Sequence, residues 1–562
     1  MTTRRHPGIA AEIPMLKNSL RPLLLVAITL SAAHGNVTLP PLISDNMLLQ
    51  SSNAAVWGKA DPGEAVTVTL GHAVATTTAD PDRNWRVKLV GLTPGVAGAM
   101  TVAGNNKLTI SNVAVGDVWV CSGQSNMDMT LAKTNWHNGV LNADEEIAAA
   151  KFPEIRMFIV SKDVSATPLE KVGGKWQVCS PETVPHWSAT AYFFGRQLHR
   201  DLDVPIGLIL AAWGGIPAQN WTPTEVLQGD PDFKTTYYDK WQQQLKEYPQ
   251  RKAKYDQETL PAWQAAADAA QKAGQPAPKK PRPPIGAPTG PGAEWAASGL
   301  YNAMIAGATR YSIKGAIWYQ GEANAWDAAR YRRLLPAMIA SWRKAWDQES
   351  FPFYIAQLPN YGPTRPEPAD SLWAELREAQ RAISLDCPHC GLAVAIDLGE
   401  ENNIHPPNKQ EVGRRIALVA EAKTYGKDIV FSGPCFDAAK FDASSVTLTF
   451  QHGTALGLAT KDGGPVKGFA IAGEDKKFVW ADARIVPLQK AAQAGSSETQ
   501  EAGIVLSSPE VPKPIAVRYA WANSPVVNLV NQAGLPAGPF RTDAWPQHES
   551  PAAATTPTNK HN

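Results

Sequence analysis

The chain has 562 residues, of which 44% are hydrophobic and 19% charged, and its formal net charge is +1. This length exceeds what one hydrophobic core usually serves, so it predicts several domains. The near-zero charge argues against nucleic acid as the main partner and against a polybasic membrane-surface protein, because both need clustered basic residues.

The first 35 residues are typical of an export signal. Lys17 and Arg21 supply positive charge, an apolar run follows at residues 23–33, and Ala33-His-Gly35 fits a small-residue cleavage site. The apolar run is shorter than the ~20 residues that a membrane span needs. We therefore predict a signal peptide at 1–35 and a periplasmic or extracellular protein whose mature chain has no integral membrane segment. The alternative is an N-terminal anchor helix.

Short alternating strands with turn residues between them mark a β module at each end of the mature chain. Residues 65–70 and 84–90 alternate with period two, which predicts an N-terminal β-sandwich module over 36–115. Strand patterns return in a C-terminal β module over 426–545. The polar, Pro- and Thr-containing segment 546–562 is predicted to be a disordered tail.

Between these modules, at residues 116–425, buried apolar runs alternate with amphipathic helical segments. This pattern predicts an α/β domain with a parallel sheet and helices on both faces. A helical and Pro-rich insertion at about 223–292 interrupts it, and we expect a helical hairpin with an extended proline-rich return. In such sheets the ligand site lies outside the carboxyl ends of the strands. The predicted strands are 117–121, 155–160, 206–211, 315–319, 353–357 and 392–396.

The five cysteines include one CxxC motif, Cys387-Pro-His-Cys390. In an exported protein this motif is typical of a local disulfide or of two structural thiols. A thioredoxin-like redox centre is the alternative, although that centre places its first cysteine after a strand and at the start of a helix. The sequence has no HExxH motif and no second CxxC motif, so it predicts no metal site.

The strongest motif is Gly123-Gln-Ser-Asn-Met127, which follows a buried strand directly. Ser125 is thereby placed on a turn at the carboxyl edge of the sheet, where backbone N–H groups can face an oxyanion. A helix cap is the structural alternative. The second motif, Asn403-Ile-His-Pro-Pro-Asn408, places His405 in a strand-to-helix loop at the same edge. His405 is therefore a candidate general base, or else an ordinary surface-loop histidine.

Two further motifs follow strands of the predicted sheet. Trp213-Gly-Gly-Ile-Pro217 contains a Gly pair whose backbone can approach a ligand closely. Trp318-Tyr-Gln-Gly-Glu-Ala-Asn324 places polar side chains where another strand ends. Four strand ends thus carry a Ser, a Gly pair, an amide-bearing motif and a His, in that chain order.

This order resembles the SGNH hydrolases, and the wording GQSNM, WGG, WYQGEAN and IHPPNK resembles their sialate O-acetylesterase branch of carbohydrate esterases. The resemblance extends to residues 300–304, 351–359 and 540–543. It implies a flavodoxin-like sheet and a carbohydrate O-acetylesterase that works without a metal or organic cofactor. Its implied partner is an acetylated oligo- or polysaccharide, either a hemicellulose such as xyloglucan or xylan, or O-acetyl sialic acid.

The resemblance also implies residue roles. Ser125 is the nucleophile and His405 the general base, and they act through an acetyl-enzyme. The backbone N–H groups of Ser125 and of Gly215 (or Gly214), together with the Gln320 side chain, form the expected oxyanion hole. Asn324 is the alternative to Gln320 as the amide donor.

The sequence departs from the family pattern at the carboxylate that orients the histidine. Asn402 stands three residues before His405, where the family usually has a carboxylate, so Asn402 is a candidate orienting residue. Other nearby candidates are Asp397, Glu400, Glu401 and Glu322. Because the usual carboxylate is missing, the alternative function is a non-catalytic carbohydrate-binding protein with a vestigial esterase domain.

Aromatic side chains fit a carbohydrate substrate, because sugar faces stack on aromatic rings. Most of the 19 tryptophans are expected in the core. Those near the motifs are predicted to line the rim of the site: Trp213, Trp221, Trp295 and Trp326. No cluster of Arg or Lys surrounds the four motifs, and this favours a neutral polysaccharide over a sialate.

Overall fold

The computed structural model describes residues 36–488 and 502–545. The predicted signal peptide and the predicted disordered tail lie outside the described residues. Within these two ranges, no helix is both long and apolar enough to cross a membrane.

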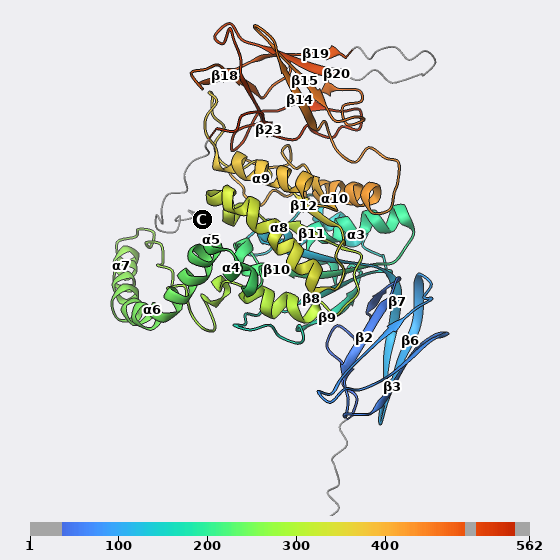
Figure 1. Ribbon diagram of the computed structural model, residues 1–562. Helices are drawn as coiled ribbons and strands as arrows, with labels where there is room; N and C mark the ends of the chain where they lie inside the picture. Colours follow the sequence, from blue (N-terminus) through green and yellow to red (C-terminus); the bar gives the residue numbers. More distant parts are fainter. Residues whose placement is uncertain (1–35, 489–501, 546–562) are drawn as a thin grey trace, which may run out of the picture. The chain divides into compact units, whose positions relative to one another are not determined.

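The centre of the fold is a parallel sheet with the strand order β13–β12–β11–β7–β10–β8–β9 (Figure 1). Neighbouring strands in this order are parallel except β8 and β9. β10, β11 and β12 are buried along their whole length and β8 at all but one residue, which explains why their sequences are continuous apolar runs. The predicted parallel sheet is therefore confirmed. Its strands are β7 (Lys107–Gly123), β8 (Ile155–Val160), β9 (Gly174–Val178), β10 (Ile206–Ala212), β11 (Gly315–Tyr319), β12 (Phe353–Ala356) and β13 (Cys390–Ala393).

Helices cover both faces of this sheet. Ile317 packs in the hydrophobic cluster that contains α3 (Ala189–Leu202) and α10 (Lys409–Lys423). Its neighbour Trp318 packs in the other cluster, with α8 (Ala328–Ala345) and α9 (Leu372–Asp386). Short helical turns fill the connections: α1 (Ser125–Asp128), α2 (Ala143–Ala148), η1 (Val184–His186), η2 (Ala218–Trp221), η5 (Ala293–Trp295), η6 (Tyr301–Ile305), η7 (Ala306–Ala308) and η8 (Glu322–Asp327).

The N-terminal strands form two layers. β2 pairs with β5, whereas β3 pairs with β4 and β6, and β6 pairs with β7. Strand β7 continues from this module into the central sheet, where residues 117–123 pair with β10 and β11. Residue 115, the predicted end of the module, therefore lies inside one strand, at the point where β7 becomes fully buried. The other strands are β1 (Leu48–Gln50), β2 (Ala54–Lys59), β3 (Ala65–Leu70), β4 (Ala73–Thr78), β5 (Asn84–Leu89) and β6 (Gly95–Ala103).

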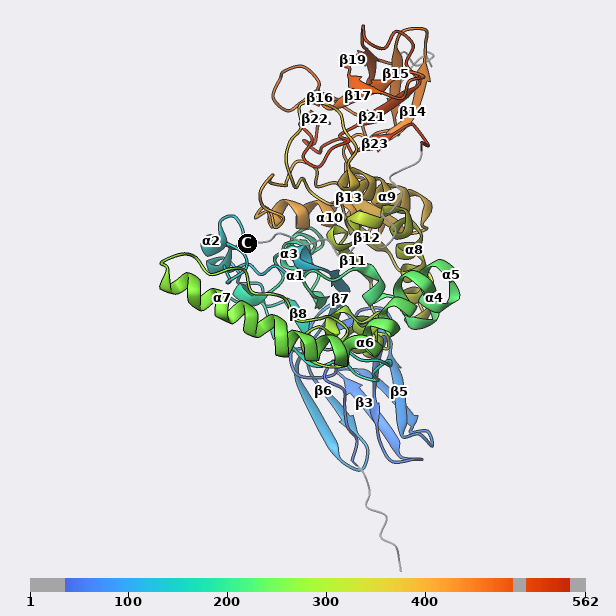
Figure 2. The same ribbon diagram turned by 90° about the vertical axis from the view of Figure 1, so that its left-hand side faces the viewer.

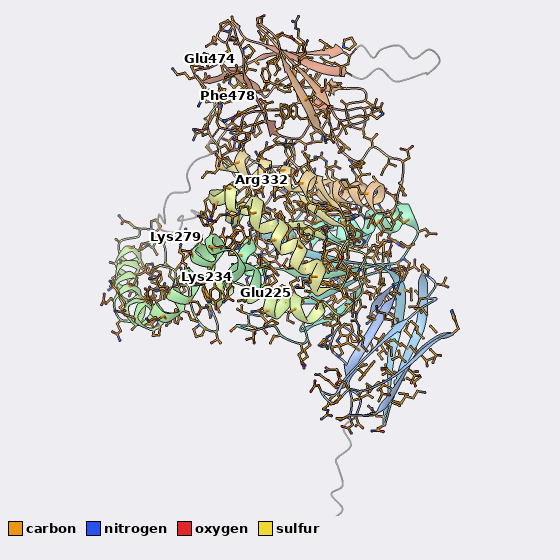
Figure 3. All side chains as sticks on the ribbon, viewed as in Figure 1. Glu225, Lys234, Lys279, Arg332, Glu474 and Phe478 are labelled. Atoms are coloured by element: carbon orange, nitrogen blue, oxygen red, sulfur yellow. The ribbon has the colours of Figure 1, made fainter. Side chains whose placement is uncertain are left out.

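The C-terminal strands form small antiparallel sheets, ordered β14–β15–β20–β19, β18–β17–β21–β23 and β16–β22. Their own core includes the stacked rings of Phe436 and Phe540, whose centroids are 4.1 Å apart. Glu474 and Phe478 mark this region in Figure 3. The strands are β14 (Phe436–Phe441), β15 (Val446–Phe450), β16 (Ala459–Thr460), β17 (Phe469–Ala472), β18 (Phe478–Trp480), β19 (Asp482–Pro487), β20 (Ala502–Ser507), β21 (Ala516–Tyr519), β22 (Leu529–Val530) and β23 (Phe540–Arg541).

The insertion differs from its prediction, because residues 231–272 form one continuous helical run rather than a helical hairpin (Figure 2). Two π-helical segments, η3 and η4, take the place of a turn. The predicted extended return is present, since Tyr255 and Trp263 donate to the carbonyls of Pro281 and Pro278 at 2.8 Å each. The run consists of α5 (Pro231–Phe233), η3 (Lys234–Asp239), α6 (Lys240–Lys254), η4 (Tyr255–Thr259) and α7 (Leu260–Lys272), and α4 (Thr224–Gly229) precedes it.

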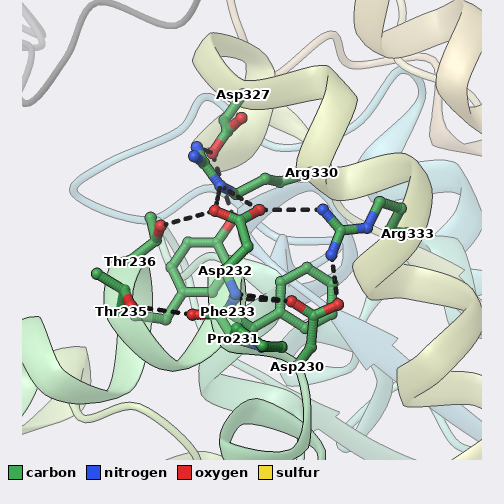
Figure 4. A network of polar contacts seen from close by, with 10 residues as sticks. Asp230, Pro231, Asp232, Phe233, Thr235, Thr236, Asp327, Arg330 and Arg333 are labelled. Carbon is green, nitrogen blue, oxygen red and sulfur yellow. Dashed lines mark hydrogen bonds and ion pairs between the residues drawn. The ribbon is translucent and has the colours of Figure 1, made fainter.

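An ion-pair network fastens the start of this insertion to α8 (Figure 4). Arg330 donates to both carboxylate oxygens of Asp232 at 2.9 Å and to Asp327 at 2.7 Å. Arg333 binds Asp232 at 3.0 Å and also binds Asp230. Because the network joins several charges, it fixes the insertion better than an isolated surface pair would.

Candidate active site

Ser125 lies where β7 ends and α1 begins, at the carboxyl edge of the central sheet. Gly123 makes this exit possible: its φ is +140°, and a Cβ there would lie 2.2 Å from the carbonyl oxygen of Tyr319. Only glycine fits both conditions. The backbone therefore turns sharply off the strand and presents Ser125 at the sheet edge.

His405 lies in the loop that connects β13 with α10, and this loop returns to Ser125. The imidazole Nε2 of His405 is 2.9 Å from the Ser125 hydroxyl oxygen, within hydrogen-bond distance. The two residues are 280 positions apart in the chain, and the carboxyl ends of the parallel strands bring them together. A serine with a neutral imidazole at this distance is the arrangement of an activated nucleophile and its base.

A buried polar network lies beneath this pair and joins both halves of it. Asn126, next to the serine, donates its side-chain amide to Glu322 at 2.6 Å and to the Ile404 carbonyl at 3.0 Å. Its side-chain oxygen accepts from Lys409 Nζ at 2.7 Å, and Lys409 also donates to the Pro406 carbonyl at 2.6 Å. The residues on either side of His405 are thus tied to the residue after Ser125.

The charges in this network are strongly affected by burial. Burial raises the pKa of Glu322, although the Asn126 hydrogen bond and the Lys409 charge oppose this. Burial lowers the pKa of Lys409 to about 7, while the nearby Glu322 and Glu400 carboxylates act in the opposite direction. Both groups are held by hydrogen bonds and by each other's charge, as buried ionisable groups require. Asn126 is the neutral bridge between them.

The Gly pair lies beside Ser125, as its position after β10 predicts. A Cβ at Gly214 would be 3.4 Å from the Cβ of Ser125. Gly215 has φ +78°, and a Cβ there would meet nothing within 4 Å, so this residue faces open space. The backbone N–H groups of Gly214 and Gly215 are therefore candidates for oxyanion donors together with that of Ser125.

Gln320 does not fit the predicted role of the third oxyanion donor. Its side chain is fully buried, and Nε2 donates to Asn324 Oδ1 at 2.8 Å and to the Ile216 carbonyl at 3.5 Å. A side-chain amide has two N–H donors, so both are used. Asn324 is engaged as well, because its oxygen accepts from Ala218 N at 2.9 Å and its amide donates to Gln219 at 3.1 Å. These two amides fasten η2 to η8.

Two of the candidate orienting residues, Glu401 and Asn402, lie in the loop before His405. Asn402 is exposed, and it is Asn403 whose side chain accepts the backbone N–H of His405, at 3.0 Å. Glu401 accepts from Thr364 N at 2.9 Å and so holds a neighbouring loop.

The two remaining acidic candidates also have other partners. Glu400 accepts from the Asn403 side-chain amide at 2.8 Å and so supports the loop before His405. Asp397 forms a two-pronged ion pair with Arg415 at 2.6 and 2.9 Å. Among the carboxylates proposed from sequence, Glu322 is the one that enters the network beneath the Ser125–His405 pair.

The aromatic rim differs from its prediction at two positions. Trp221 is fully buried in the core against Trp318, so it cannot line the rim. Trp213, Trp295 and Trp326 are partly buried. Trp136, which lies outside the four motifs, is 43% exposed, and its ring centroid lies 5.1 Å from that of His405.

Only weak sequence signals pointed to three further residues near the Ser125–His405 pair, namely Asn126, Lys409 and Trp136. Asn126 and Lys409 stand inside the quoted motifs, but a contact between residues 283 positions apart cannot be seen in one sequence. Trp136 lies in the polar loop after α1, next to His137, whose imidazole accepts from Gly139 N at 3.0 Å. The available sequence signal for Trp136 was a Trp-His pair in a polar loop downstream of the serine motif.

Comparisons with known proteins find carbohydrate esterases. Residues 287–421 match the family described as carbohydrate esterase, sialic acid-specific acetylesterase. The chain is 29% identical to the sialate O-acetylesterase of Mus musculus, over 92% of this chain and 96% of that protein. It is 29% identical to the Homo sapiens enzyme, over 91% and 94%. The crystal structure of a carbohydrate acetylesterase from Xanthomonas citri is 31% identical, with a TM-score of 0.73, over 91% of this chain and all of that one.

Proposed function

Because the chain belongs to the sialic acid-specific acetylesterase family of carbohydrate esterases, we propose that Ser125 and His405 release acetate from an O-acetylated glycan. The protein is a carboxylic ester hydrolase of the carbohydrate acetylesterase type. The observation that carries the proposed mechanism is the 2.9 Å contact between His405 Nε2 and the Ser125 hydroxyl.

The proposed reaction has two halves. The Ser125 oxygen attacks the acetyl carbonyl while His405 Nε2 takes the hydroxyl proton. The tetrahedral intermediate then expels the sugar oxygen, which receives that proton from His405, and an acetyl-enzyme remains. In the second half His405 deprotonates a water, the water attacks the acetyl-enzyme, and acetate leaves as Ser125 regains its proton.

Backbone donors supply the proposed stabilisation of the oxyanion. In this proposal the N–H groups of Ser125 and of Gly214 or Gly215 bind the oxyanion, and the position of Gly214 against Ser125 supports this assignment. Each such donor is worth about 3 kcal/mol in the transition state. The positive φ of Gly215 keeps this backbone in a conformation that other residues rarely adopt.

In this proposal the surroundings of His405 hold its ring beside Ser125. The Asn126 network fixes the loop that carries His405 through the carbonyls of Ile404 and Pro406. This anchoring keeps the base at hydrogen-bond distance from the Ser125 hydroxyl, which the proposed proton transfer requires.

For the substrate we propose a neutral acetylated hemicellulose, such as xyloglucan or xylan oligosaccharides. A sialate carboxylate would need a cation free to bind it. Lys409 is fully buried and occupied by Asn126 and Pro406, and Lys162 is paired with Asp128 at 2.7 Å. The exposed Trp136 offers a stacking face for a neutral sugar beside His405. O-acetyl sialic acid remains the second candidate, because the curated mammalian relatives are sialate O-acetylesterases.

Replacing Trp136 with alanine is expected to raise KM for an acetylated oligosaccharide about 3- to 10-fold, because the sugar loses its aromatic contact. For 4-nitrophenyl acetate, which has no sugar, KM should change less. Trp480→Ala is the matched control, since Trp480 is 42% exposed but lies in the C-terminal module. Equal KM changes in the two variants would remove Trp136 from the substrate rim.

The proposed function is tested by acetate release from acetylated xyloglucan, acetylated xylan, O-acetyl sialic acid and 4-nitrophenyl acetate. We expect the highest kcat/KM on a neutral glycan. Acid quenching during turnover, followed by peptide mass spectrometry, should find an acetyl group on Ser125. If acetate is released at saturating substrate but no acetylated Ser125 peptide is detected, the proposed acetyl-enzyme intermediate is contradicted. Binding of these glycans without acetate release would instead favour the vestigial-esterase alternative.

We further propose that the protein is exported, on the basis of the signal-peptide pattern in residues 1–35. N-terminal sequencing of the protein recovered from the periplasm or medium should then begin near Asn36. Recovery of the chain only from the cytoplasm, with its N-terminus intact, would overturn this proposal.

A further inference from the structure

The CxxC motif takes no part in the esterase site and forms a tight turn of its own. Cys387 follows the last residue of α9, and Cys390 is the first residue of β13. The Cys390 N–H donates to the Cys387 carbonyl at 3.2 Å, with Pro388 at the second position and His389 at φ +55° in the third. Such β-turns hold their end Cα atoms within about 7 Å, which overlaps the ~4.4–6.8 Å range of disulfides.

A buried guanidinium contacts both sulfur atoms of this turn. Arg343, in the last turn of α8, is 7% exposed. Its Nη1 is 3.8 Å from Cys387 Sγ and its Nη2 is 3.9 Å from Cys390 Sγ, while Nε donates to the Phe351 carbonyl at 3.0 Å. The two cysteines are therefore held on one side of a fixed positive charge.

This guanidinium has no carboxylate partner among the ion pairs of the described residues. The acidic residue next to the motif, Asp386, instead pairs with Arg332 at 3.4 Å, on the exposed side of α8 (Figure 3). A buried charge needs a counter-charge. The group placed to supply it is a thiolate of the CxxC turn.

Cys387 is the cysteine suited to that role. The hydrogen bond from Cys390 and the Arg343 charge lower the pKa of Cys387 against the opposing effect of burial. The same hydrogen bond and burial raise the pKa of Cys390. Cys387 is also partly exposed and lies next to exposed residues, whereas Cys390 is buried. The pair thus has one accessible thiolate and one protected thiol.

We propose that Cys387 and Cys390 form a thiol–disulfide exchange site, with Cys387 as the attacking thiolate and Cys390 as the resolving thiol. The co-reactant is a small or protein disulfide, R–S–S–R. The Cys387 thiolate bonds to one of its sulfurs and releases RS⁻. Cys390 then loses its proton, attacks the Cys387 sulfur and releases the second RS⁻. The two cysteines lose two electrons, and the co-reactant is reduced to two thiols.

The site is separate from ester hydrolysis. Cys390 is at the amino end of β13, while Ser125 and the His405 loop follow the carboxyl ends of their strands. Exchange at this turn is therefore expected to leave acetate release unchanged, so its test does not depend on the proposed esterase mechanism.

The test uses the full-length reduced protein and oxidised glutathione as the disulfide. Peptide mapping should find a Cys387–Cys390 disulfide in the wild type and a Cys387–glutathione adduct in Cys390→Ser. At pH 7, iodoacetamide should alkylate Cys387 at least about 10-fold faster than Cys435, whose pKa is raised by burial. Arg343→Gln should slow the alkylation of Cys387.

Cys387→Ser should keep the wild-type rate of acetate release. If Arg343→Gln does not fold, the pH profile of Cys387 alkylation in the wild type replaces it, with a midpoint expected below the ordinary thiol value of about 8.5. Alkylation of Cys387 no faster than that of Cys435, or glutathione treatment that yields no Cys387–Cys390 disulfide, would overturn the proposal.

Discussion

Alanine in place of Ser125 is expected to lower kcat for acetate release by about a thousandfold to a millionfold. The hydroxyl that bonds to the acetyl group is then absent, and the remaining backbone donors can only stabilise attack by water. The fold should be intact, because the substitution removes one oxygen from a partly buried side chain at the start of α1. Steady-state kinetics on 4-nitrophenyl acetate and on the preferred glycan measure the effect.

Ser122→Ala is the matched control for this prediction. Ser122 is on β7, three residues before Ser125, and is fully buried. Its removal should leave kcat within about threefold of the wild-type value, since it lies inside the sheet rather than at its edge. Residual activity of Ser125→Ala above a few per cent would assign the nucleophile to another residue.

The architecture and the contact between Ser125 and His405 could be predicted because both depend on local sequence. Buried parallel strands read as continuous apolar runs, and the motifs that follow them meet at one sheet edge. The roles predicted for Gln320 and Asn402 depended on where their side chains point, and a single sequence does not give that direction. A strand-end amide can point to the substrate or into the sheet, and Gln320 turns to Asn324. In the loop before His405, it is Asn403, the neighbour of Asn402, whose side-chain oxygen accepts the backbone N–H of His405.

Packing explains the other differences. Trp221 follows the Gly-pair motif closely, but η2 turns it into the core, where it meets Trp318. Helical periodicity followed by a proline-rich segment predicts a helical hairpin with an extended return in the insertion. The helix instead continues through Tyr255–Thr259 as a π-helical segment, and the reversal comes only after Lys272. Sequence periodicity does not distinguish a short turn from a π segment that keeps the helix running.

Asn126→Ala is the substitution outside the catalytic pair with the largest expected effect. It removes the bridge between Glu322 and Lys409 and the bond to the Ile404 carbonyl, next to His405. Two buried charged groups lose a partner, so we expect the free energy of unfolding to fall by about 3–5 kcal/mol. The loop that carries His405 loses its anchor, and a small displacement of the base lowers kcat about 100-fold with little change in KM.

A matched variant separates positioning from general instability. Asn531 is a buried asparagine of the C-terminal module that donates to the carbonyls of Ser432 and Thr454 at 2.9 and 3.0 Å. Asn531→Ala should also lose stability, measured by urea unfolding, but should keep the wild-type kcat below its unfolding transition. Both variants lose buried hydrogen bonds, but only Asn126 is bonded to the His405 loop and to the charged groups beneath it. A kcat for Asn126→Ala equal to that of Asn531→Ala would show that the network stabilises the fold without positioning the base.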